Sequence, residues 1–228
     1  MSSKYQSGRP KLACEIAADR VIAARAADSR QVLELCSTSE LAPGCVVPDL
    51  TEGNLRQPDA VVSALREVLG NVGSRSREVT AVLPDAAVRV ALLDFETLPQ
   101  NREEAEGVVR FRLRKSLPFD VDKAKVSYQA QTSNGTVRVV AAVALNSVIQ
   151  EYEAVIREAG FNPGVVLPSM LAALGSADAK KPTLVVKVDA HTTSIAILNE
   201  DQLQLFRTLE NPRGVTITGE QLAEEPIP

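Results

Sequence analysis

Tryptophan is absent from this 228-residue sequence, and aromatic residues make up only 4% of it. So few aromatic rings leave little for stacking against bases or sugars. The net charge of −4 provides no general attraction for nucleic acid or for anionic lipid. We therefore expect a protein that does not bind nucleic acid or other polyanions in general.

Cysteine and histidine are also scarce. The three cysteines, Cys14, Cys36 and Cys45, form no Cys-x-x-Cys pair, which argues against a zinc site and against a disulfide framework. Reduced thiols in a cytoplasmic protein are the expected state. His191 is the one histidine, and no serine or cysteine stands in a recognisable nucleophile motif, so His191 is expected to be a turn residue rather than a base. The sequence predicts neither catalytic residues nor a metal site.

Long hydrophobic runs are missing as well. No stretch approaches the roughly 18 apolar residues that cross a bilayer, so no transmembrane segment is expected. Residues 1–10 are polar and lack the apolar centre of a secretory signal, and we interpret them as a flexible tail. These absences favour a cytoplasmic protein.

The sequence does contain a hydrophobic fraction of 45%, enough to bury a core built from Val, Leu, Ile and Ala. Short apolar-rich segments between polar turns alternate with stretches of helical periodicity, which predicts an α/β protein. The expected strands are 11–17, 21–26, 32–36, 79–83, 88–95, 125–131, 137–143, 165–167, 184–188, 194–198 and 203–207. The expected helices are 58–70, 101–115, 147–160, 169–174 and 218–225.

The expected helix at 101–115 has acidic residues early and basic residues late. Glu103 and Glu104 lie in its first turn, and four basic residues lie within 110–115. Because this order complements the helix dipole, we interpret the charges as stabilising the helix ends rather than as a phosphate or nucleic-acid site. The segment that follows, Leu117-Pro118-Phe119, is either an ordinary loop anchor or part of a groove that binds a partner.

The end of the sequence repeats the pattern of its beginning. Two three-strand meanders start about 170 residues apart, and each has a tight turn between its first two strands. In the actin, Hsp70 and sugar-kinase fold, two such turns hold the phosphates of ATP between duplicated lobes. That task requires inward-pointing N–H groups, small residues, hydroxyls and an acid for magnesium.

The similarity extends to sequence blocks between and around the turns. The blocks are 108–122, 126–129, 139–143, 148–152, 159–163, 190–197 and 202–207. In order and spacing they resemble the PilM family, the actin-like cytoplasmic proteins of type IV pilus assembly. The resemblance implies an α/β, actin-like fold of duplicated RNase H-like lobes with a small inserted α/β subdomain. It divides the chain into a first lobe at 11–87 and 161–180, an inserted subdomain at 88–160, and an incomplete, truncated second lobe at 181–228.

By this resemblance the phosphate turns would contain Glu15, Ala17, Ala18 and Asp19 in the first lobe, and Lys187, Ala190, Thr192 and Thr193 in the second. Glu15 keeps the family's acid, but alanine replaces the glycines of the first turn. At the second turn, Lys187 stands where the family has an acid and Asp189 where it has a glycine. These substitutions predict that ATP binding is weak or lost, and with it ATP hydrolysis. Lys187 is suited to pair with a phosphate, with Glu15 or with Asp189.

The resemblance implies a scaffold protein rather than an enzyme. Such a protein would be cytoplasmic and peripheral to the inner membrane, and would bind the cytoplasmic tail of a PilN-like pilus protein in a cleft beside the inserted subdomain. It would also couple to the pilus motor or platform, and an exposed strand edge would need a partner or a second copy in a homodimer. The alternatives are the equivalent GspL-like component of type II secretion and an ATP-binding or ATP-hydrolysing protein of the same fold.

Overall fold

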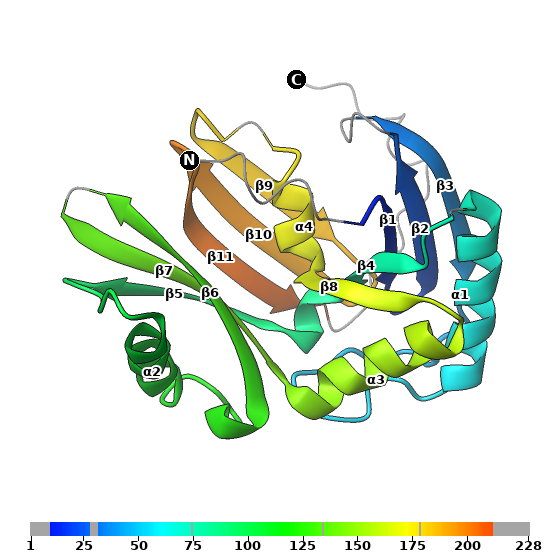
Figure 1. Cartoon of the computed structure of the whole chain (residues 1–228), viewed down its shortest axis with the longest axis horizontal. Helices are drawn as coiled ribbons and strands as arrows, with labels where there is room; N and C mark the ends of the chain where they lie inside the picture. Colours follow the sequence, from blue (N-terminus) through cyan, green and yellow to red (C-terminus); the bar gives the residue numbers. More distant parts are fainter. Residues whose placement is uncertain (1–9, 28–31, 74, 134, 178, 212–228) are drawn as a thin grey trace.

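The computed structural model describes residues 10–27, 32–73, 75–133, 135–177 and 179–211. Three sheets and the helices packed on them make up this part of the chain (Figure 1). Residues 1–9 of the expected tail and the expected helix at 218–225 lie outside the described residues.

A five-stranded sheet forms the first lobe, with the strand order β3-β2-β1-β4-β8. Its strands are β1 (Leu12–Ile16), β2 (Arg20–Ala26), β3 (Leu33–Glu40), β4 (Glu78–Leu83) and β8 (Asn162–Pro168). The first three form the antiparallel meander that the sequence predicts, and β4 and β8 extend the sheet in parallel to β1. Alternation along β1 places Leu12, Cys14 and Ile16 on one face, where each is only 1% exposed, and Glu15 on the other.

Helices α1 (Pro58–Val72) and α3 (Asn146–Glu158) pack on the buried face of this sheet (Figure 1). Apolar residues at helical spacing and a proline in the first turn explain why α1 forms and which side it buries. The apolar stripe of α3, which includes Tyr152 and Ile156, packs in the same core. We expected this helix to belong to the inserted subdomain at 88–160, and that assignment is wrong, because its stripe faces α1 and the first sheet.

The inserted subdomain is an antiparallel sheet of order β5-β7-β6 with helix α2 on one face. The short helix η2 (Asp85–Ala87) follows β4 and packs in the core of the first lobe. The elements of the subdomain are β5 (Arg89–Phe95), α2 (Arg102–Leu113), η3 (Val121–Lys123), β6 (Ala124–Ser133) and β7 (Thr136–Leu145). Val109 and Leu113 of α2 are fully buried against this sheet. The Asn101 side chain accepts hydrogen bonds from the backbone N–H groups of Glu103 and Glu104, which confirms the predicted start of the helix.

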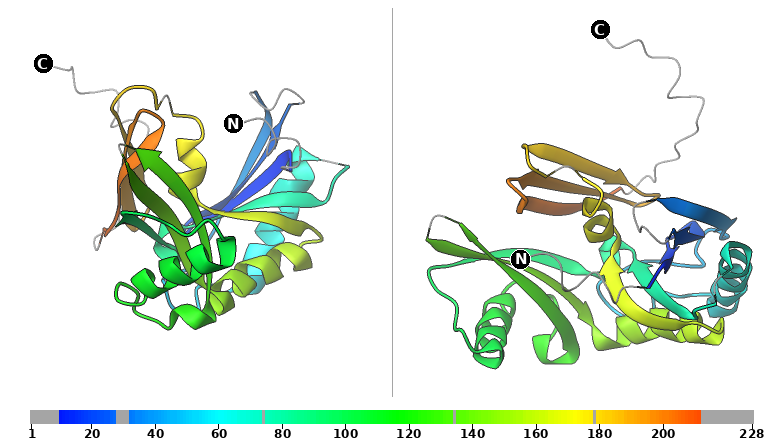
Figure 2. Two further views of the ribbon diagram at one scale, coloured as in Figure 1. Left: turned by 60° about the vertical axis from the view of Figure 1, so that its left-hand side comes forward. Right: turned by 45° about the horizontal axis from the view of Figure 1, so that its top comes forward.

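The second lobe is represented by a three-stranded antiparallel sheet of order β11-β10-β9. Its strands are β9 (Thr183–Val188), β10 (Thr192–Asn199) and β11 (Gln202–Glu210), and the short helix α4 (Ser169–Leu174) precedes them. Phe206 of β11, Met170 of α4 and Val90 of β5 meet in a third apolar core, which joins this sheet to the rest of the molecule. The sheet lies on the side of the first lobe away from α1 and α3 (Figure 2).

Candidate functional site

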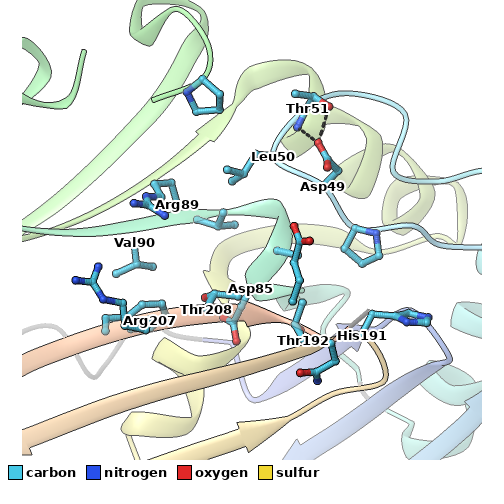
Figure 3. A pocket seen from close by; sticks show the side chains of 17 residues that line it. Asp49, Leu50, Thr51, Asp85, Arg89, Val90, His191, Thr192, Arg207 and Thr208 are labelled. Carbon is cyan, nitrogen blue, oxygen red and sulfur yellow. Dashed lines mark hydrogen bonds between the residues drawn. The ribbon is translucent and has the colours of Figure 1, made fainter. Parts of the chain in front are cut away.

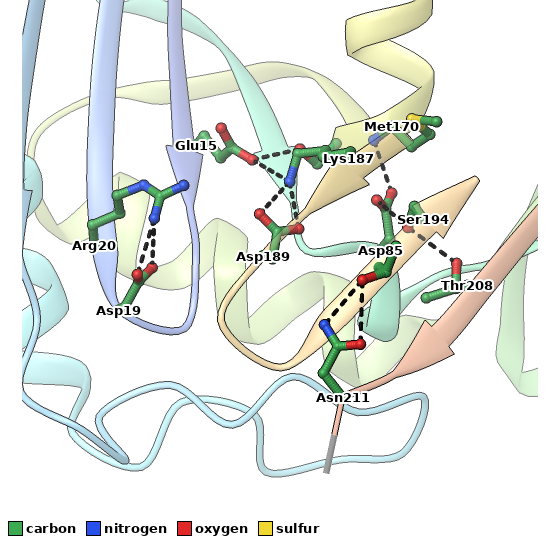
Figure 4. Close-up of polar contacts among 12 residues, drawn as sticks. Glu15, Asp19, Arg20, Asp85, Met170, Lys187, Asp189, Ser194, Thr208 and Asn211 are labelled. Carbon is green, nitrogen blue, oxygen red and sulfur yellow. Dashed lines mark hydrogen bonds and ion pairs between the residues drawn. The ribbon is translucent and has the colours of Figure 1, made fainter. Parts of the chain in front are cut away.

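The two predicted phosphate turns approach each other across the boundary between the lobes (Figure 4). One turn joins β1 to β2, and the other joins β9 to β10. In each, a backbone N–H closes the hairpin: Ala17 donates to the carbonyl of Arg20 at 2.9 Å, and Asp189 donates to the carbonyl of Thr192 at 2.8 Å. These two donors are therefore used within their own hairpins.

Lys187 links the two lobes beside these turns. Its Nζ lies 3.5 Å from Oε1 of Glu15 on β1, and it also forms an ion pair with the carboxylate of Asp189 in its own turn. The hydroxyl of Ser169, at the start of α4, donates a hydrogen bond to the same Glu15 carboxylate. The Lys187 side chain is only 20% exposed, so water screens these charges less than it does on an open surface. The sequence analysis leaves a phosphate, Glu15 and Asp189 as possible partners of Lys187, and in the structure Lys187 contacts Glu15 and Asp189.

The space left between the turns is small, about 30 Å³. It is lined by Glu15, Ala17, Ala18, Pro48, Pro84, Ala86, Asp189, His191 and Thr192. Three predicted positions lie beside it. Asp19 pairs with the neighbouring Arg20, the Thr193 hydroxyl accepts a 3.0 Å hydrogen bond from the Asn211 amide, and Ala190 lies in the turn itself. The predicted residues are thus near one another, but around a space that admits little more than a water molecule.

Asp85 is a site residue in the short connection between the expected strands 79–83 and 88–95, and the sequence does not single it out. It is 2% exposed; its Oδ1 accepts a 2.9 Å hydrogen bond from the backbone N–H of Met170, and its Oδ2 accepts a 2.8 Å bond from the hydroxyl of Ser194 on β10. Burial raises the pKa of Asp85, and the two hydrogen bonds and Lys187 partly oppose that shift. The local sequence signal for such a site residue is an acid directly after Pro84 at the end of a buried strand. An ordinary surface turn explains the same pattern equally well.

A larger cleft, of about 610 Å³, opens next to Asp85 (Figure 3). Its walls come from the loop at 48–51, the start of β5, and the second half of β11. Arg89 and Arg207 contribute positive charge to the lining, and Asp49 and Glu210 contribute negative charge. Residues of the first lobe, the inserted subdomain and the second lobe therefore meet in one cleft.

The loop wall of this cleft is held in place by part-buried hydrogen bonds. The Glu151 carboxylate on α3 accepts bonds from the backbone N–H groups of Gly53, Asn54 and Leu55, at 2.7, 2.8 and 3.2 Å. The Asn54 side chain is fully buried and bonds in turn to backbone groups of Asp49 and to the carbonyl of Thr51. A segment that the sequence presents only as a loop is thus a braced part of the site.

The predicted partner-binding segment divides between two environments. Leu117 and Phe119 are half-buried and pack against the core of the inserted subdomain, as a loop anchor would. Pro118 between them is exposed and lines the 610 Å³ cleft. The segment has features of both interpretations, and only Pro118 is placed to contact a ligand in that cleft.

A second groove, of about 440 Å³, lies between β6, β7, α3 and β8. Its lining is mainly apolar, with Lys125 and Glu153 among its charged residues. None of the helices in the described part of the chain has the length and apolar character that a membrane span requires. Within the same ranges, no group of three or more His, Cys, Asp or Glu side chains is placed to hold a metal ion.

Solved structures with the same arrangement identify the fold. The chain is similar to a protein of a PilM–PilN type IV pilus biogenesis complex, with a TM-score of 0.76 and 22% identity, over 88% of this chain and 62% of that one. It is also similar to the cytoplasmic domain of EpsL, an inner-membrane component of the type II secretion system of Vibrio cholerae, with a TM-score of 0.58 and 13% identity, over 87% and 70% of the two chains. A Bacteroides thetaiotaomicron protein with an actin-like ATPase fold and unknown function matches with a TM-score of 0.50 and 12% identity, over 88% and 69%.

These similarities confirm the expected α/β, actin-like fold with an inserted subdomain and an incomplete second lobe. The chain spans 62% of the length of the matched protein in the PilM–PilN complex. No curated protein matches the chain. The family model of the type IV pilus assembly protein PilM matches residues 15–224, which is most of the sequence, and the chain belongs to this family.

Proposed function

We propose that the chain is an actin-like assembly protein of a type IV pilus that binds the cytoplasmic tail of a PilN-like inner-membrane protein. Its family supports the role in pilus assembly. The similar solved structure is a complex of PilM with PilN, which supports the type of partner. We propose that the tail binds in the 610 Å³ cleft beside the inserted subdomain.

The borders of this cleft suit an extended peptide. Among the described strands, β5 and β11 are edge strands of their sheets, and both contribute to the lining. An edge strand offers backbone N–H and C=O groups to an added chain, while pockets between side chains select its sequence. Leu50, Pro118 and Phe206 supply apolar contacts at three points of the cleft.

The charged residues of the cleft suit a tail in which charged residues flank an apolar segment. Asp49 and Glu210 are acidic, and cytoplasmic segments close to a membrane span are enriched in Lys and Arg. Arg89 and Arg207 lie along the same cleft and would pair with a carboxylate of the tail. Binding in this way would hold the protein at the cytoplasmic face of the inner membrane, within reach of the pilus motor or platform.

Two alternatives use the same fold. A GspL-like role in type II secretion is supported by the similarity to the EpsL domain, at lower identity than the PilM match. An ATP-binding protein is supported by the neighbour with an actin-like ATPase fold. We propose that ATP binding is weak or lost in this chain, because acidic side chains and Lys187 fill the position between the turns.

Titration with synthetic N-terminal peptides of neighbouring inner-membrane pilus proteins tests the proposal. Calorimetry or fluorescence anisotropy would measure the dissociation constant for the wild-type chain and for Arg207→Glu. We expect the charge reversal to weaken binding about tenfold or more, because it places a carboxylate in the cleft.

Lys125→Glu is the matched control, since it makes the same charge change in the 440 Å³ groove and should leave the affinity unchanged. The proposal fails if no pilus peptide binds. The assigned site is wrong if Lys125→Glu weakens binding while Arg207→Glu does not.

A further inference from the structure

The residues between the two turns do not fit the magnesium nucleotide that the fold implies. The space between the turns, where the phosphates would lie, is about 30 Å³, which admits little more than a water molecule. The first turn has Ala17 and Ala18 where close approach to phosphates favours glycine. Glu15 and Asp189 face this space from opposite lobes, so they would repel a triphosphate unless a cation intervened.

We infer that Lys187 is this cation, and that Glu15, Lys187 and Asp189 form an internal latch that holds the lobes together in place of a bound nucleotide. Lys187 belongs to β9 of the second lobe and Glu15 to β1 of the first. The ammonium group lies between the two carboxylates, 3.5 Å from Glu15 Oε1 and paired with Asp189 (Figure 4). We call these three residues the ionic latch.

The charges of the latch are interdependent. Its two acids lie on different lobes, and their side chains are only 22% and 15% exposed. Without the positive charge between them, two partly desolvated carboxylates would repel each other across the lobe boundary. The hydroxyl of Ser169 keeps the Glu15 carboxylate oriented towards Lys187. Lys187 therefore changes a repulsive contact between lobes into an attractive one.

A second bond between the lobes lies close to the latch. Asp85, just after β4 of the first lobe, accepts the hydroxyl hydrogen bond of Ser194 on β10, at 2.8 Å. Asp85 also lines the 610 Å³ cleft, as do His191 and Thr192 of the second turn. The latch consequently keeps one end of that cleft in its present shape without a ligand between the lobes. This inference stands on the contacts themselves and does not depend on which partner the cleft binds.

Hydrogen–deuterium exchange of the full chain, read by mass spectrometry, tests the latch. Lys187→Met keeps most of the length of the side chain but removes its charge. We expect the peptides covering both turns to exchange about fivefold faster in this variant, since a partly buried ion pair contributes on that scale. Adding Glu15→Gln removes the repulsion, so the double variant should exchange more slowly than Lys187→Met alone.

Arg20→Met is the control, because it removes a cation whose ion pair, among the described residues, is with Asp19 in the same turn. We expect it to leave the exchange of the β9–β10 turn unchanged. The latch is refuted if Lys187→Met exchanges at the wild-type rate, if Glu15→Gln gives no rescue, or if Arg20→Met accelerates both turns equally.

A second experiment adds nucleotide to the wild-type chain alone. It therefore tests the inference even if a variant does not fold. Millimolar Mg-ATP should leave the exchange of both turns unchanged and give no heat of binding in calorimetry. Protection of the turns by Mg-ATP would overturn the inference, whether or not pilus peptides bind.

Discussion

Glu151 on α3 accepts a 2.8 Å hydrogen bond from the backbone N–H of Asn54, a residue 97 positions earlier in the chain. The same carboxylate also accepts the N–H groups on either side of Asn54. One anionic side chain thus satisfies three consecutive backbone donors and ties the loop of the cleft to a helix of the first lobe. The position of that loop is a property of the helix rather than of the loop sequence.

Replacing Glu151 by alanine should therefore lower stability more than a surface change. The substitution leaves three part-buried N–H groups without their charged acceptor, and we expect the free energy of unfolding to fall by about 2–3 kcal/mol. Urea denaturation followed by circular dichroism measures this. Glu153→Ala, which removes only an (i, i+4) ion pair with Arg157 on the same helix, should cost about 0.5 kcal/mol or less. Equal losses for the two variants would show that Glu151 does not brace the loop.

The buried carboxyl of Asp85 should make stability depend on pH. Burial raises the pKa of Asp85 above its ordinary value of 3.8, so the folded state holds this proton more tightly than the unfolded state does. The stability that Asp85 contributes by titrating is fully present below the ordinary pKa, and it is lost as pH rises through the folded-state pKa.

Asp85→Asn removes this titration and serves as the reference. We expect the free energy of unfolding of the wild type, relative to Asp85→Asn, to decrease as the pH is raised from about 4 to about 7. Urea titrations of both proteins across this range provide the difference. A difference that grows with pH would mean that the folded-state pKa of Asp85 is lowered instead.

The cysteines should differ widely in reactivity. Burial raises the pKa of the Cys14 thiol to about 12, and Cys45 is only 1% exposed, whereas Cys36 is exposed on β3. Because the thiolate is the reactive form and must also be accessible, Cys36 should react with a maleimide or a disulfide reagent at least about a hundredfold faster than Cys14. Mass spectrometry of the labelled native protein should show one fast site, and all three cysteines should react in denaturant. Fast native labelling of Cys14 would contradict its burial on β1.

Much of the local structure could be predicted from the sequence. The alternation of Leu12, Cys14 and Ile16 specifies a strand with one buried face, and Asn101 before two glutamates specifies a helix start. Both patterns act between residues close in the chain, so propensity and periodicity suffice to identify them. The repeated meander and the blocks between its two copies were likewise enough to indicate the family.

Tertiary structure decided where those elements pack and which polar groups meet. The apolar stripe of α3 indicates that the helix buries one side. It does not indicate whether that side faces the first sheet or the sheet of the inserted subdomain. In the same way, the sequence left Lys187 with several possible partners, while Glu15, the acid it meets on the other lobe, lies near the start of the sequence. Contacts over such separations arise from the packing of whole sheets, and no local preference of either residue encodes them.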